Sequence, residues 1–310
     1  MPSSLERIKR VWIALFAISA IALIGYVINT HRATFESLRL VEPSMLVLCV
    51  ALHVTFWLLA TVFWRQTVSV ASGKTLRLAE SFHQLALVAV GKYLPGKIWG
   101  LLARGAVLKD TGISIQGVIA AAVIEQWVML MSAALVSGAL LVAMRSDSVL
   151  TSLGIVGMVI GLAGSHLFTL GSSQLQRLLA SNVNTQGHNL PILLAHGSYL
   201  RLMVIHALMW VILGAVLAAI CFAFALHPFT LELFAALVLA NTIGFVVGFA
   251  AIFAPGGLGV REAVTTAVLL PYIPLEQAAI LSISFRLWTT ASDALLALTI
   301  ALQTFQSARR

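Results

Sequence analysis

The chain has 310 residues, of which 60% are hydrophobic and only 10% are charged, and its mean hydropathy is +1.00. This composition excludes an ordinary soluble globular protein. The net charge of +8 at pH 7 does not indicate nucleic-acid binding, because the Lys and Arg residues are scattered through apolar stretches. We therefore predict an all-α, polytopic transmembrane helical bundle forming a single domain over residues 1–310, with no cofactor and no metal.

Apolar runs of spanning length recur along the chain, since a membrane span needs about 20 residues. They cover residues 11–28, 45–64, 117–143, 150–170, 201–226, 232–253 and 278–304. No small-residue cleavage site follows the run at 11–28, so we interpret it as a retained helix. Two shorter apolar stretches, 79–92 and 257–270, are candidate half-helices.

Two proline-glycine breaks interrupt the hydrophobic sequence next to these short stretches. The first is LPGK at residues 94–97 and the second is APGGLG at residues 254–259, and a shift of 160 residues superposes one on the other. Non-helical backbone at membrane depth is tolerated where it is buried in protein or lines a cavity. The breaks are therefore the first place to look for a site.

The basic residues predict the orientation of the chain. Arg7, Lys9 and Arg10 precede the first predicted helix, and Arg309 and Arg310 end the chain. The positive-inside rule places both termini in the cytoplasm. We therefore expect a multi-pass protein of the inner, cytoplasmic membrane. The loops between the helices are consistent with this orientation only if each broken region returns to the side from which it came.

That condition predicts two opposed re-entrant helical hairpins, one over residues 79–115 and one over residues 232–276. The halves of the chain, about 1–146 and 147–310, would then share one plan in opposite orientations, which is an inverted-topology repeat. The alternative is that residues 232–253 cross the membrane and do not turn back, because this run is long enough to span it.

Ionisable residues inside a membrane cost about 2.5 to 3.5 kcal/mol each on insertion scales and commonly mark function. Around the breaks their sum is positive, which favours an anion such as a phosphate or phosphodiester. Gly256 and Gly257 fit either close hairpin packing or a backbone amide nest facing a headgroup. The predicted substrate-binding residues are Lys97, Arg104, Gly256, Gly257, Arg261, Glu262 and Arg286.

Several of the charged residues also have structural interpretations. Glu262 fits either a substrate role or an ion pair with a basic neighbour. Glu125 and Arg286 lie at nearly equivalent places in the two halves, so they fit either a buried ion pair across the pseudo-twofold axis or a ligand or proton role. Asp293 lies seven residues beyond Arg286, on the same helical face. Glu125 and Asp293 are therefore the ion-pair or proton-carrier candidates.

Two motifs carry a resemblance to a known family. They are YLPGKIWG at residues 93–100, followed by Arg104, Gly112 and Glu125, and PGGLGVRE at residues 255–262, followed by FRL at 285–287. Together they resemble the lysylphosphatidylglycerol synthase transmembrane family, also called flippase-like domain proteins. The chain has Trp99-Gly100 where many members have a Gly-Glu pair.

This resemblance implies an integral membrane protein that handles anionic lipids. By it, Lys97 and Arg104 take the positions of the basic residues of the first motif, and Glu262 that of the acid of the second motif. We expect a lipid flippase or transporter that moves an anionic phospholipid or a polyprenyl-phosphate-linked lipid across the cytoplasmic membrane.

An enzymatic role is the alternative. The chain ends shortly after its last predicted helix, so we expect no aminoacyltransferase or glycosyltransferase domain and no enzyme activity. The alternative function is a membrane subunit or enzyme of lipid-linked glycan or glycolipid biosynthesis. A structural partner that recruits a glycosyltransferase is a third possibility. The expected partners are the lipid and membrane enzymes of glycan biosynthesis, with no nucleic acid.

Overall fold

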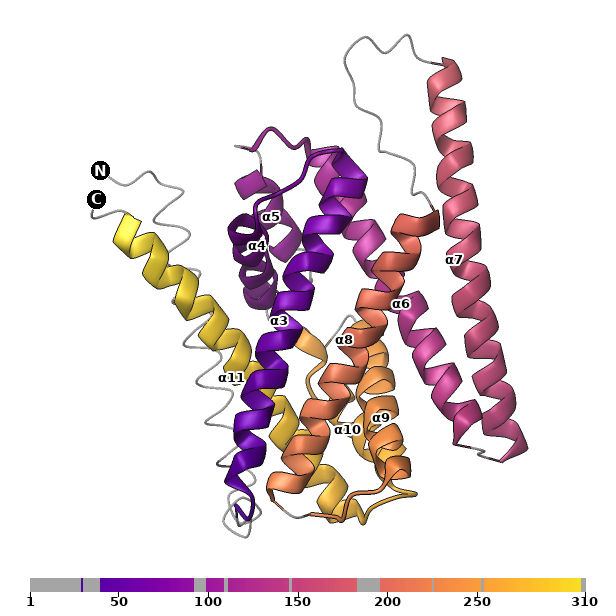
Figure 1. The fold of residues 1–310 in the computed structure, drawn as a ribbon, viewed down its shortest axis with the longest axis vertical. Helices are drawn as coiled ribbons and strands as arrows, with labels where there is room; N and C mark the ends of the chain where they lie inside the picture. The colour runs from indigo at the N-terminus through magenta and orange to yellow at the C-terminus, as the bar shows by residue number, and fades with distance from the viewer. Residues whose placement is uncertain are drawn as a thin grey trace.

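A computed structural model of the chain describes residues 29, 40–91, 99–108, 111–144, 147–182, 196–224, 226–251 and 254–307. Over these residues the protein is all-helical, as predicted, and Figure 1 shows the helices as one bundle. The helices are α3 (Pro43–Ser72), α4 (Leu78–Gly91), α5 (Trp99–Leu108), α6 (Ile115–Ala143), α7 (Ser148–Asn182), α8 (His196–Ala223), α9 (Leu231–Ala250), α10 (Val260–Leu269) and α11 (Leu275–Ser307), with a short 3₁₀ helix, η2 (Pro255–Gly257), before α10.

Five of the helices are long and apolar enough to span a membrane. They are α3, α6, α7 over Ser148–Gly171, α8 over Gly197–Ala223, and α9. Each predicted span between residues 45 and 253 corresponds to one of these five helices, so the chain is a multi-pass membrane protein. The predicted helix at 11–28 lies outside the described residues.

Helix α11 covers the predicted span at 278–304, but it is not one of the five. It has 33 residues, so its length of about 50 Å exceeds the thickness of the hydrocarbon core. Its middle carries Arg286 and Asp293 among several hydroxyl side chains, which lower its hydropathy. The prediction of a helix here is confirmed, while its apolar character is interrupted by a polar stretch.

Local signals in the sequence set several helix ends. Ser114 caps α6 by accepting a hydrogen bond from the backbone N–H of Gly117, and Thr230 caps α9 in the same way through Leu233. Gly73 ends α3 with a φ of 71°, a left-handed conformation that glycine adopts without a steric penalty. These caps fix where α6 and α9 begin.

The core lies between the spanning helices. Helix α3 packs against α4, α6 and α8, with Trp64 fully buried among them. A second buried cluster joins α8 and α9 to α10 and α11. Large apolar side chains remain exposed on the outer faces, for example Val47 of α3 and Leu167 of α7. Such faces suit contact with lipid.

The short stretches predicted at 79–92 and 257–270 form the short helices α4 and α10. Helices α4 and α5 have 14 and 10 residues, or about 21 and 15 Å, and cannot cross a core about 30 Å thick. They pack against each other next to one end of α3, whereas α9 and α10 pack against each other towards the other end of the bundle (Figure 1). The first break, at residues 94–97, lies outside the described residues.

Candidate functional site

The second proline-glycine break forms the turn between α9 and α10. Gly256, Gly257 and Gly259 have φ angles of 60°, 75° and 78°. A residue with a side chain adopts this left-handed region only at a cost, so the glycines permit a turn that other residues would strain. Helix α10 begins at the next residue, Val260, and packs back against α9.

Arg261 crosses the face of α9 next to this turn. Gly248 leaves the space that the Arg261 side chain occupies, because a Cβ at Gly248 would collide with Cγ of Arg261. A Cβ on Gly257 would lie 3.0 Å from Cδ of the same arginine. The guanidinium carbon lies 3.9 Å from the centre of the Phe245 ring, a cation–π contact. Gly248 and Gly257 thus shape the path of the Arg261 side chain.

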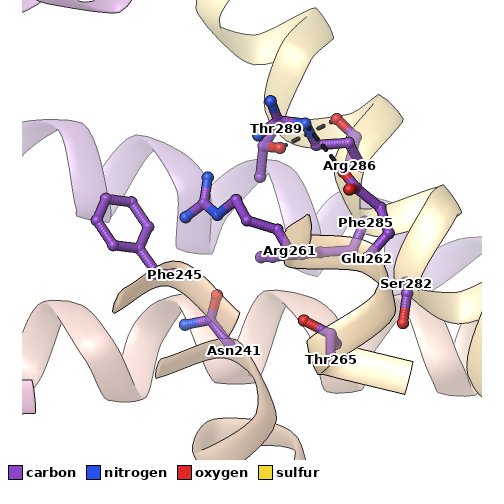
Figure 2. A pocket seen from close by; sticks show the side chains of 9 residues that line it. All are labelled: Asn241, Phe245, Arg261, Glu262, Thr265, Ser282, Phe285, Arg286 and Thr289. Carbon is purple, nitrogen blue, oxygen red and sulfur yellow. Dashed lines mark hydrogen bonds and ion pairs between the residues drawn. The ribbon is translucent and has the colours of Figure 1, made fainter. Parts of the chain in front are cut away.

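A cavity opens beside Arg261, between α9, α10 and α11 (Figure 2). Its volume is about 20 Å³, which is room for a water molecule but not for a lipid headgroup. Its charged residues are Arg261, Glu262 and Arg286, all of which were predicted from the sequence. The other lining residues are Asn241, Phe245, Thr265, Ser282, Phe285 and Thr289.

Glu262 and Arg286 form an ion pair that connects α10 to α11. Nε of Arg286 lies 3.2 Å from Oε1 of Glu262, and both side chains are largely buried. Nη2 of Arg286 also donates a 2.9 Å hydrogen bond to the carbonyl oxygen of Gly256. Arg286 therefore holds both the glycine-rich turn and the first turn of α10. Glu262 therefore forms an ion pair with a basic neighbour, which is one of the two interpretations given above.

Arg104 and Glu125 form a separate cluster between α5 and α6. Nη1 of Arg104 donates a 2.6 Å hydrogen bond to Oε2 of Glu125, and Nη2 donates a 3.4 Å bond to Oε1. The guanidinium carbon also lies 3.5 Å from the centre of the Trp64 ring, and Arg104 is only 2% exposed. Glu125 and Arg286 thus each pair with a residue of their own half, so the idea that they pair with each other is wrong. Their partners depend on which helix faces pack together, which the spacing did not show.

Of the remaining predicted residues, one lies away from the cavity and one is not described. Asp293 is buried on α11, at 7% exposure, and is not among the residues that line the cavity. Lys97 lies outside the described residues.

The sequence reasoning missed the uncharged polar residues of the cavity. Asn241 is the clearest case, because it is an amide in the middle of α9, a predominantly apolar helix. A buried polar group in such a helix needs a partner or a function, and this signal could have identified it.

The comparisons with known proteins agree with this architecture. Among curated proteins, none matches the chain well enough to identify a relative. The family described as Lysylphosphatidylglycerol synthase TM region matches residues 11–297, which include both motifs, all the described spans and all the cavity residues. The chain therefore belongs to the lysylphosphatidylglycerol synthase TM region family.

Proposed function

We propose that the protein is a lipid transporter that moves an anionic lipid, either a phospholipid or a polyprenyl-phosphate-linked lipid, across the inner membrane. The observation that carries this proposal is the position of Arg261. Its guanidinium lines a cavity at the glycine-rich turn, between helices whose outer faces are apolar. An arginine in a site of low dielectric binds phosphate oxygens strongly. Family membership supports a membrane protein of this kind.

We further propose that α4–α5 and α9–α10 are re-entrant hairpins of an inverted repeat, with both chain termini in the cytoplasm. In each half, an arginine–glutamate pair joins the second short helix to the long helix that follows. Arg104 of α5 pairs with Glu125 of α6, and Glu262 of α10 pairs with Arg286 of α11, with acid and base exchanged. The two helix pairs lie towards opposite ends of the bundle (Figure 1), which supports entry from opposite faces.

Because the cavity is small, helices around it must move apart before a lipid headgroup can bind. A volume of about 20 Å³ cannot hold a headgroup, so the proposal requires the site to open further than it does here. Opening requires α10 and α11 to separate, and the Glu262–Arg286 pair and the Thr266–Ser282 hydrogen bond are polar contacts that span them. A phosphate entering beside Arg261 would compete with Glu262 for Arg286. Substrate binding would thereby weaken one of the contacts that keep the site closed.

The test is transbilayer movement in proteoliposomes that contain a lipid with a fluorescent acyl chain, read out by chemical quenching of the outer leaflet. Arg261→Gln should lower the rate at least about tenfold, because the change removes a charge-assisted contact. Arg201→Gln is the matched control, since Arg201 is exposed on α8 and not among the cavity residues. Equal rates for Arg261→Gln and wild type would refute the assignment.

The alternative, an enzyme of lipid-linked glycan synthesis, is tested in the same preparation. Incubation with labelled polyprenyl-phosphate sugars should leave the lipids chemically unchanged if the protein only transports them. A new covalent lipid product, detected by mass spectrometry and absent with Arg261→Gln, would replace the transport proposal with the enzymatic one.

A further inference from the structure

The ring of Phe245, on α9, contacts two side chains from different helices. The guanidinium carbon of Arg261 lies 3.9 Å from the centre of the ring, and Figure 2 shows the arginine extending towards it. The indole of Trp210, on α8, lies 5.1 Å from the same ring centre at an interplanar angle of 70°. Aromatic pairs prefer this edge-to-face arrangement. Because protein interiors are closely packed, a rotation of the indole would displace Phe245 and its contact with Arg261.

A hydrogen bond from a third helix sets the orientation of Trp210. Trp210 is 2% exposed, and its Nε1 donates a 3.1 Å hydrogen bond to Oγ of Ser132, on α6. A buried indole N–H needs an acceptor, so the ring adopts the orientation that brings Ser132 within reach. Phe245 packs against the same buried cluster, which includes Met129 and Ala133 of α6. Ser132 thus fixes the edge that the indole presents to Phe245.

Ser132 is itself held in place by its surroundings. It is fully buried, and its hydroxyl donates a 3.0 Å hydrogen bond to the carbonyl oxygen of Met129. Nδ1 of His206, one turn before Trp210 on α8, lies 3.1 Å from the same Oγ. A hydroxyl has one hydrogen and two lone pairs, so Ser132 can accept from Trp210 and His206 while it donates to Met129. This use of every position leaves the hydroxyl little freedom to turn.

We propose that Ser132 and Trp210 are positioning residues that hold the Arg261 guanidinium at the cavity through the ring of Phe245. Neither Ser132 nor Trp210 lines the cavity, so their effect on a ligand there must pass through other side chains. This inference rests on the proposed function, because it concerns the arginine assigned to the lipid phosphate. Neither residue belongs to the two sequence motifs.

The alternative is that the cluster only holds α6, α8 and α9 together. Its loss would then lower the stability of the whole protein without a particular effect on Arg261. The experiment must therefore observe Arg261 itself as well as the unfolding temperature.

NMR spectroscopy of the purified protein in detergent, with isotopically labelled arginine, reports the position of Arg261. Protons above the face of an aromatic ring resonate upfield, so the Nε–H signal of Arg261 senses Phe245. The signal is assigned by its absence from Arg261→Gln, and Phe245→Leu gives its position without the ring. A signal at the same position in wild type and Phe245→Leu would overturn the proposal at this first step.

Ser132→Ala leaves the indole N–H of Trp210 without its acceptor. The Arg261 signal should then move most of the way to its position in Phe245→Leu, because the indole must turn to find another partner. Adding Trp210→Phe removes the unpartnered N–H and keeps an aromatic ring, so the signal should return most of the way to wild type. Trp210→Leu removes the indole and its N–H together, should move the signal as far as Ser132→Ala does, and gives the same test if Ser132→Ala does not fold.

Leu202→Ala is the matched control for lost stability. Leu202 is also on α8 and fully buried, but it belongs to the core cluster around α3 and not to that of Phe245. Its truncation should lower the unfolding temperature and leave the Arg261 signal in place. An unmoved signal in Ser132→Ala or Trp210→Leu, or an equal movement in Leu202→Ala, would overturn the proposal.

Transbilayer movement is measured separately, so that the positioning role and the transport function can fail independently. Ser132→Ala should lower the rate towards that of Arg261→Gln, and in the Arg261→Gln protein it should lower the rate by less than about twofold further, because both changes act on one contact. A displaced Arg261 signal with a wild-type rate would refute the role of Arg261 in transport and leave the positioning role standing. A full loss of movement in Ser132→Ala with an unmoved signal would refute the positioning role and leave transport standing.

Discussion

Arg104 of α5 and Glu125 of α6 are joined by two hydrogen bonds, of 2.6 and 3.4 Å, beneath the ring of Trp64. This geometry uses the planar fork of the guanidinium against both carboxylate oxygens. Because Arg104 is 2% exposed and engaged on several sides, it positions α5 on α6. The sequence predicted that Arg104 binds the substrate. These contacts indicate a structural role instead, which the next experiment tests.

The first prediction concerns this pair. Arg104→Gln alone should cost about 3 kcal/mol of unfolding free energy, because it leaves the carboxylate of Glu125 without its counter-charge. Adding Glu125→Gln should recover most of that loss, since no isolated charge remains. Denaturant titration of the purified protein in detergent measures the free energies. A ligand role for Arg104 would show itself as a double variant that is stable but does not move lipid.

The spans could be predicted because bilayer thickness fixes their length. The runs at 45–64 and 201–226 needed only a count of apolar residues. The glycine-rich turn could also be anticipated, since glycine adopts these φ angles without a steric penalty. These features depend on the local sequence and on the membrane around it, so a single sequence is enough to predict them.

The pairing of charges could not be predicted in the same way. The sequence indicated Glu125 or Asp293 as the partner of Arg286, whereas the structure pairs it with Glu262, and this choice depends on how α10 rotates against α11. The role of Asn241 depends likewise on which face of α9 meets the cavity. Side-chain partners across helices are set by tertiary packing, which hydropathy and spacing do not encode.

The second prediction separates stability from function at Glu262. Glu262→Gln removes the charge that holds Arg286 but keeps the size of the side chain. We expect the closed contact between α10 and α11 to weaken and lipid movement to fall about tenfold or more, because an acceptor of the site is also lost. The proteoliposome assay gives the rate, and the unfolding temperature reports the fold. A variant that moves lipid at the wild-type rate would show that this carboxylate serves packing only.

The third prediction concerns pH at the start of α4. Glu80 accepts hydrogen bonds from the side chain and the backbone N–H of Arg77, which lower the pKa of its carboxyl. A lowered pKa in the folded state means that the stabilisation is present above the ordinary glutamate pKa of about 4.3 and is lost as pH falls through the lowered value. Hydrogen exchange in the first turn of α4 should therefore be slower in wild type than in Glu80→Gln at neutral pH. At a pH below the lowered value the two proteins should exchange alike, and a difference that persists in acid would contradict this account.

The last prediction concerns Gly248, whose missing side chain gives Arg261 its path across α9. Gly248→Ala would place a methyl group against Cγ of Arg261, so the arginine must leave the ring of Phe245 and turn away from the cavity. Lipid movement should fall towards the rate of Arg261→Gln, although every charge is still present. Gly171→Ala is the control, because a Cβ at Gly171 meets no atom within 4 Å, and alanine favours a helix. If Gly248→Ala moved lipid as fast as Gly171→Ala, the position of Arg261 over α9 would not matter for transport, and the site would have to be sought elsewhere.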